Sequence, residues 1–206
     1  MSTHDTETEP IIPPAFEPVK NLLEQQIQEG LHPGAQLCVA LHGEVVADFA
    51  VGETVAGSGI PLTSASVMPL FSSAKPITAV AIGILADSGR LSVADRVAVH
   101  IPEFAADGKS SVQIRHLMNH TAGLADDALA DGGANCAEVI VSLGDSRMHE
   151  GWVPGERSAY IPTSGWHILG ELIERASGIS FEDFVQDFVL SPLNMDSTFP
   201  NVDPLM

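Results

Sequence analysis

Residues 71–89 read FSSAKPITAVAIGILADSG and place a serine and a lysine three residues apart at the start of an apolar run. This spacing puts Ser72 and Lys75 one helical turn apart on the same face of a helix. If Ser72 opens that helix, its hydroxyl lies where unpaired backbone N–H groups favour a developing negative charge. Lys75 can then act as a base toward the serine. Since apolar residues surround nearly the whole circumference, we expect the helix to be buried.

Tyr160 is the only tyrosine of the chain. A nucleophile, a base and a second proton-transfer group are what an acyl-transfer site needs, and Ser72, Lys75 and Tyr160 provide these three functions. The alternative is a helix cap at Ser72 followed by a solvated lysine. Two observations argue against this alternative. The chain has only three lysines, and Lys75 adjoins a helix that is too apolar to lie on a surface. A charge beside a buried helix is costly unless it is paired or lies in a cleft.

Composition limits the classes of partner. With 27 acidic and 9 basic residues, the formal charge is −18, so nucleic acids and anionic membranes, which need a basic surface, are poor partners. Cys38 and Cys136 are too few for a disulfide framework and are expected to be reduced, buried thiols. Neither a signal peptide nor an apolar stretch of about 18 residues is present. We therefore expect a cytoplasmic protein, and leave its oligomeric state open. The expected partner, a small-molecule ester or amide substrate, follows from the acyl-transfer residues and not from composition.

The 206 residues suffice for one domain or two small ones. We predict a flexible leader over 1–16, an N-terminal helix and β-hairpin over 17–62, and a mostly helical region over 63–206 that carries the serine, lysine and tyrosine. The hairpin spans 37–52 and turns at Gly43-Glu44. Further helices are predicted over 112–123, 137–143, 164–178 and 180–190.

The remaining histidine and tryptophan motifs do not indicate a further catalytic or metal site. His116 and His120 stand four residues apart, as in helical zinc sites, but the expected glutamate and a third ligand are missing. We interpret both as structural histidines near a helix end. Trp152 and Trp166 are interpreted as packing or cleft-wall residues. No metal or organic cofactor is implied.

Six segments, in the same order as in the family, resemble the serine β-lactamase and penicillin-binding-protein superfamily, most closely its class C-like branch, which includes esterases and D-amino-acid peptidases. They cover most of residues 18–200. The segments are HPGAQLCVALHGEVVADFAVG, FSSAKPITAVAIGILADSGRLSVADRV, IPEF, VQIRHLMNHTAGL, VPGERSAYIPTSGWHILGELIERASG and LSPLNMDSTF. The resemblance implies an α+β fold of the β-lactamase/transpeptidase type, with an antiparallel sheet, flanking helices and an all-helical region. Only the first hairpin and the helical region are expected here.

The resemblance also assigns roles to residues. Ser72 would be the acylated nucleophile, Lys75 its base partner, and Tyr160 the tyrosine of the family's second motif. That motif is usually Tyr-x-Asn or Tyr-x-Ser but reads Tyr160-Ile161-Pro162 here. Because Pro162 has no polar side chain, the motif points toward esterases and away from efficient penicillin hydrolysis.

The family's third motif, Lys-Thr-Gly or a His or Trp variant, does not occur after Tyr160. In the family, the strand that bears this motif supplies the second oxyanion-hole N–H, and losing one such donor costs about 2.7–4 kcal/mol. The chain thus resembles the N-terminal part of such a hydrolase. Two functions stay open: an esterase-like serine hydrolase with an acyl-enzyme on Ser72, or a truncated, inactive remnant or binding module of the same family. A third alternative, an acidic helical interaction protein, does not explain the motifs.

Overall fold

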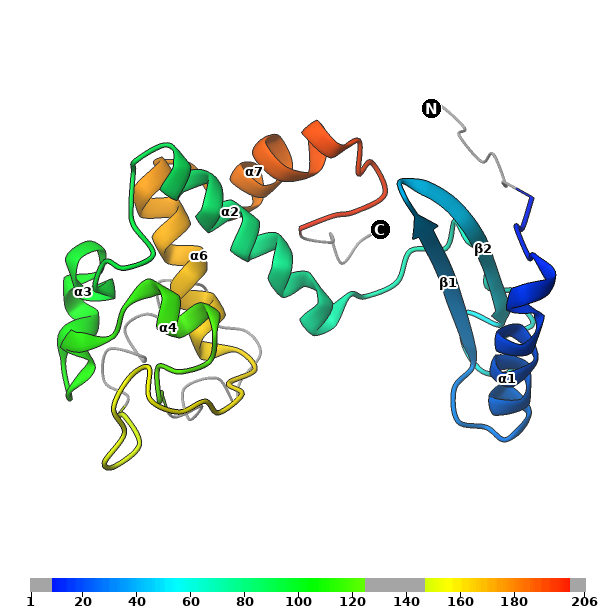
Figure 1. Ribbon diagram of the computed structural model, residues 1–206, viewed down its shortest axis with the longest axis horizontal. Coiled ribbons are helices and arrows are strands. Elements are labelled where there is room, and N and C mark those ends of the chain that lie inside the picture. The colour runs from blue at the N-terminus through cyan, green and yellow to red at the C-terminus, as the bar shows by residue number, and fades with distance from the viewer. Residues whose placement is uncertain (1–8, 125–146, 201–206) are drawn as a thin grey trace. The chain divides into compact units, whose positions relative to one another are not determined.

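A computed structural model describes residues 9–124 and 147–200 of the chain (Figure 1). The short helix predicted over 137–143 and Cys136 lie outside these residues, as does the first half of the predicted leader. The chain divides into two compact units, Met1–Met68 and Pro69–Met206. The division predicted from the sequence, at residues 62 and 63, lies close to this boundary.

The first unit is a β-hairpin with one helix. β1 (Gly34–Leu41) and β2 (Glu44–Gly52) pair antiparallel, with Leu41 opposite Glu44. His42 and Gly43 connect them with φ angles of 53° and 87°, as in a two-residue turn that follows the twist of the strands. The predicted hairpin is therefore confirmed, but its turn is His42-Gly43, one residue before the predicted Gly43-Glu44.

The helix predicted from Glu17 is also confirmed, as α1 (Glu17–Gln28), which contacts both strands. A 3₁₀ turn, Pro14–Phe16, precedes it. Upstream, Ile11 exchanges two backbone hydrogen bonds with Asp48 of β2, so part of the segment predicted as a leader pairs with the hairpin.

The core of this unit is formed by every second residue of β2. Ala47, Phe49 and Val51 are buried on one face, as the two-residue period of a strand requires. Cys38 of β1 is a free thiol but is exposed, so its predicted burial was wrong. Successive residues of a strand point to opposite faces, and Cys38 lies on the face of β1 that is turned away from the apolar contacts.

The second unit is helical and contains the main core. Its helices are α2 (Lys75–Asp87), α3 (Val97–His100), α4 (Ile114–Met118), α6 (Ser164–Ser177) and α7 (Phe181–Val185). Short 3₁₀ turns lie at Phe71–Ala74, Pro102–Ala105, Lys109–Ser111 and Ser191–Leu193, and a π-helical turn, Gln186–Leu190, continues α7. The helices predicted over 164–178 and 180–190 are confirmed, the first ending at Gly178 with a left-handed φ of 84°.

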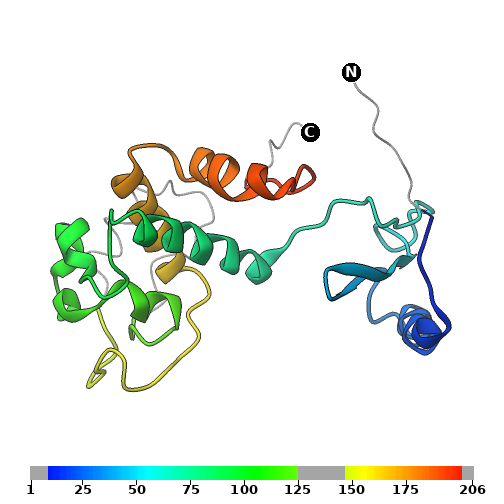
Figure 2. The same ribbon diagram turned by 45° about the horizontal axis from the view of Figure 1, so that its top comes forward.

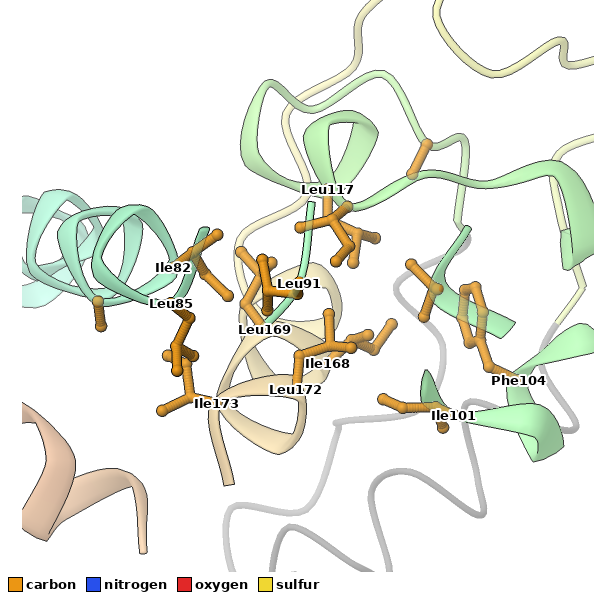
Figure 3. Packing of buried hydrophobic residues seen from close by; sticks show 14 of the residues in the cluster. Ile82, Leu85, Leu91, Ile101, Phe104, Leu117, Ile168, Leu169, Leu172 and Ile173 are labelled. Carbon is orange, nitrogen blue, oxygen red and sulfur yellow. The ribbon is translucent and has the colours of Figure 1, made fainter. Parts of the chain in front are cut away.

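α2 and α6 lie side by side in both views of the ribbon (Figures 1 and 2). Ile82 and Leu85 of α2 face Leu169 and Ile173 of α6 in the centre of the core (Figure 3). The prediction that α2 is buried is confirmed for this side. The prediction was wrong for the opposite side, where Val80 is 49% exposed, because α6 and α7 cover only one face of α2.

The helix predicted over 112–123 is shorter than expected. α4 ends at Met118, and two residues later His120 takes a left-handed φ of 58°. A left-handed residue cannot continue a right-handed helix, so the chain turns away here. This turn brings residues 120–124 toward the site described below. Within the described residues, no helix has both the length and the apolar character needed to cross a membrane.

Leu172 lies at the centre of the core and is fully buried. Replacing it by alanine removes three carbons and leaves a cavity that neighbouring helices fill only in part. We expect Leu172→Ala to lower the free energy of unfolding by about 2–5 kcal/mol, measured by urea denaturation. Leu193→Ala is the matched control, since Leu193 is 63% exposed and its loss should cost about 0.5 kcal/mol or less. Equal effects of the two changes would contradict this description of the core.

Candidate active site

Ser72 and Lys75 lie at the entry of α2. Ser72 is in the 3₁₀ turn Phe71–Ala74, and Lys75 is the first residue of the helix. Pro76 occupies the first helical turn, where the missing N–H leaves no hydrogen bond unmade. Phe71, directly before the serine, has a left-handed φ of 48° and is 85% exposed. A bulky residue in this region is strained, and such strain persists only where the surrounding structure holds it.

Ser72, Lys75 and Tyr160 form one hydrogen-bonded row. Lys75 Nζ donates to Ser72 Oγ over 3.1 Å, and Ser72 Oγ lies 2.6 Å from the hydroxyl oxygen of Tyr160, 88 residues away in sequence. Because the serine oxygen accepts from the lysine, its own proton is free to point toward the tyrosine. The structure thus brings together all three residues that the sequence singled out.

The electrostatics of the row stabilise the phenolate form of Tyr160 relative to that of an isolated tyrosine. The hydrogen bond from Ser72, and then hydrogen bonding and the charge of Lys75, lower the pKa of Tyr160 below its ordinary value of 10.0. The Lys75 ammonium lies 5.5 Å from the centre of the Tyr160 ring and 5.4 Å from that of Trp166, within the range of cation–π contacts. Tyr160 is 59% exposed, so water screens part of this effect.

Since Tyr160 is the only tyrosine, its ionisation can be followed in the whole protein by the near-ultraviolet absorbance of tyrosinate. We expect the phenol to titrate below its ordinary pKa of 10.0 in the wild type. Ser72→Ala and Lys75→Met should each raise this pKa, since each removes a group that stabilises the phenolate. Lys20→Met, on α1, is the control and should leave the titration unchanged. The same pKa in all four proteins would rule out the described row in solution.

His120 belongs to this site, although we had interpreted it as structural. Its ring centre lies 4.7 Å from that of Tyr160 and 5.8 Å from that of Trp166. Its Nδ1 accepts from the backbone N–H of Ile161 over 3.3 Å. The sequence offered one usable signal, a histidine directly after a short helix, but nothing in the pattern pointed to its left-handed backbone.

His116 has another function, since its Nδ1 accepts from the Gln113 N–H and closes the capping box of α4. In the described parts of the chain, no three His, Cys, Asp or Glu side chains gather as a metal site would require.

Trp152 and Trp166 line different parts of the same region. The Trp152 indole donates to Thr121 O over 3.0 Å and so ties the loop that leads to Tyr160 to the turn after α4. Trp166, near the start of α6, lies under the Lys75 ammonium, and its indole nitrogen is buried without a hydrogen-bond partner. Trp152 is a packing residue, as predicted, whereas Trp166 also contacts the charged group of the site.

The chain is similar to known proteins in both sequence and fold. The sequence model of the Beta-lactamase family matches residues 19–205. Penicillin-binding protein 4* of Bacillus subtilis is 36% identical over 145 residues, which cover 67% of this chain and 31% of that protein. Esterase EstB of Burkholderia gladioli is 31% identical over 200 residues, covering 89% of this chain and 51% of the esterase. A solved family VIII carboxylesterase superposes with a TM-score of 0.76 at 27% identity, over 95% of this chain and 54% of the carboxylesterase. The chain thus spans about half or less of the length of these relatives.

Proposed function

Because this chain belongs to the beta-lactamase family, whose members similar to it include penicillin-binding proteins and esterases, we propose that it is a serine hydrolase that cleaves an ester or amide bond through an acyl-enzyme on Ser72. The observation that carries this proposal is the row of Lys75 Nζ, Ser72 Oγ and the Tyr160 oxygen, joined at 3.1 and 2.6 Å. These distances are those at which a nucleophile and its base exchange a proton.

In the proposed acylation, Ser72 Oγ attacks the carbonyl carbon of the substrate while its proton passes to the Tyr160 oxygen, which lies 2.6 Å away and whose pKa is lowered. The Lys75 ammonium, which donates to Ser72 Oγ, supplies the positive charge that stabilises the tyrosine as the proton acceptor. The Ser72 backbone N–H stabilises the negative charge on the carbonyl oxygen at the start of α2. The bond to the leaving alcohol or amine then breaks, and that group takes the proton.

Deacylation reverses these roles. A water molecule gives its proton to the Tyr160 oxygen and attacks the acyl carbon. The bond to Ser72 Oγ breaks, Ser72 Oγ takes that proton back from Tyr160, and the carboxylic acid leaves. The proton that leaves the water molecule is the one that Ser72 regains, so the step requires no further proton donor or acceptor.

We infer that esters are preferred over β-lactams. Pro162 stands where the family has Asn or Ser, so the side chain that would hydrogen-bond a substrate amide is missing. Leu70 and Phe71, beside Ser72, are both largely exposed and offer an apolar surface to an acyl chain. The similarity to an esterase and to a carboxylesterase supports the same preference.

The test is hydrolysis of p-nitrophenyl butyrate and of the β-lactam nitrocefin by the 206-residue chain. We expect turnover of the ester with a kcat/KM at least about tenfold above that of the β-lactam, the difference that roughly 1.4 kcal/mol of transition-state binding produces. Ser73→Ala, at the serine next to the nucleophile, is the control for specificity. A folded chain that binds the ester without releasing product would favour the alternative, a non-catalytic remnant or binding module.

A further inference from the structure

We propose that His120 is a positioning residue that holds the Tyr160 hydroxyl against Ser72 through its imidazole Nδ1 and its backbone carbonyl. For its effect on the reaction, this inference rests on the proposed function. The placement of Tyr160 by His120, in contrast, can be tested without turnover. His120 touches neither Ser72 nor a reacting atom in the described contacts, so it acts through the tyrosine.

His120 fixes the backbone on both sides of Tyr160. Its carbonyl oxygen accepts from the Ala159 N–H over 3.0 Å, and its Nδ1 accepts from the Ile161 N–H over 3.3 Å. The residues before and after the tyrosine are thus bound to one amino acid. This matters because Tyr160 lies in a segment without helix or strand and is 59% exposed.

The imidazole ring also packs against the tyrosine ring. The two ring centres are 4.7 Å apart at an interplanar angle of 48°, and the ring centre of Trp166 lies 5.8 Å from that of the imidazole. These contacts restrict rotation of the phenol, so its oxygen stays within reach of Ser72.

The left-handed φ of His120 permits this arrangement. At 58° it lies in a region that residues with a Cβ rarely adopt. The surrounding hydrogen bonds hold it there. Strain of this kind is kept at functional sites where it aims a side chain.

For Nδ1 to accept a hydrogen bond, the imidazole must be neutral with its proton on Nε2. Burial first, and the charge of Lys75 second, lower the pKa of His120 below its ordinary value of 6.5. Among residues 9–124 and 147–200, the titratable groups that face the ring are Lys75 of α2 and Tyr160 itself. α6 presents the uncharged Trp166, and Arg157 of the adjacent loop lies over Trp152 instead.

The arrangement therefore has a predictable response to pH. A second proton on the imidazole removes the Nδ1 acceptor and places a positive charge near Lys75. Because the pKa of His120 is lowered, this loss sets in below about pH 6.5. We expect the reactivity of Ser72 to fall on the acid side with the titration of His120.

Two variants separate the functions of the imidazole. His120→Asn keeps an acceptor near the position of Nδ1, tolerates a left-handed φ and cannot be protonated. His120→Phe keeps a ring but has no acceptor. We expect His120→Phe to slow covalent labelling of Ser72 by a fluorophosphonate about threefold to tenfold, the loss of one neutral hydrogen bond. His120→Asn should recover most of this loss and should lack the acid limb set by the histidine.

The tyrosinate absorbance of Tyr160 provides a readout that does not depend on labelling. We expect its pKa to move toward the ordinary value in His120→Phe and to stay near that of the wild type in His120→Asn. Thermal denaturation of each variant confirms folding. If His120→Phe does not fold, the pH profile and titration of His120→Asn decide alone.

Wild-type titration and labelling rates in a folded His120→Phe would overturn the inference. So would an unchanged acid limb in His120→Asn. If the wild type itself is not labelled, the proposed function fails, while the tyrosinate titration still decides whether His120 positions Tyr160.

Discussion

Replacing Ser72 by alanine is expected to reduce ester hydrolysis by up to about 10⁶-fold, as loss of a serine nucleophile does in another serine hydrolase. Ser72 Oγ is the one atom that contacts both Lys75 and Tyr160 in the row. Without it, no covalent intermediate forms and the two proton-transfer groups have no nucleophile to activate. The measurement is kcat/KM for p-nitrophenyl butyrate in purified wild type and Ser72→Ala.

Ser73→Ala is the matched control for this result. Ser73 is the same residue type, one position later in the same turn, and its backbone N–H bonds Leu70 O over 3.0 Å. Its hydroxyl is not part of the described row, so the substitution should leave hydrolysis unchanged. Equal loss in both variants would mean that the turn before α2 had been disturbed and that Ser72 is not specifically required.

Replacing Lys75 by methionine should lower kcat by about 10²–10⁴-fold, the range that one acid–base group contributes. Methionine keeps most of the length and volume of the chain but removes the ammonium. The change deletes the donor to Ser72 and one of the groups that lower the pKa of Tyr160. Because Lys75 acts on the proton rather than on binding, KM should change far less than kcat.

Lys20→Met is the control for loss of a lysine. Lys20 pairs with Glu24 on α1 at 2.7 Å, one turn apart, in the first unit. Removing that pair should leave kcat unaltered and cost little stability, since exposed pairs contribute about 0–1 kcal/mol. If Lys75→Met retained more than about a tenth of the wild-type kcat, the lysine would have no part in proton transfer.

The sequence predicted much of the fold, because the decisive signals were local. A serine and a lysine three residues apart, followed by Pro76 and an apolar run, mark the start of α2, and the alternating residues around Gly43 mark the hairpin. The order of the resembling segments predicted the family and the α+β fold, and the match over residues 19–205 and the similarity to solved relatives confirm both.

Local sequence signals also predicted part of the site, the contact between Ser72 and Lys75. The spacing of Ser72 and Lys75 fixes their distance within one helical turn, so their contact follows from the sequence. The approach of Tyr160 does not follow from spacing, since 88 residues separate it from Ser72. It was anticipated only because Tyr160 is the sole tyrosine and falls within a resembling segment.

His120 shows what the pattern could not predict. Its place in the site depends on a left-handed backbone after α4 and on two hydrogen bonds to residues about 40 positions away. Similarly, the apolar circumference of α2 indicated burial on all sides, but α6 and α7 cover only one face. Both outcomes are set by tertiary packing, which a helical period does not encode.

The most direct test of the central claim, that the row activates Ser72, is the intact mass of the chain after exposure to a fluorophosphonate. Near-ultraviolet circular dichroism on the same sample establishes that the protein is folded. We predict one adduct per folded chain, located on Ser72 by peptide mapping, and none on Ser72→Ala. A folded wild type without an adduct, or an adduct that persists in Ser72→Ala, would contradict the claim.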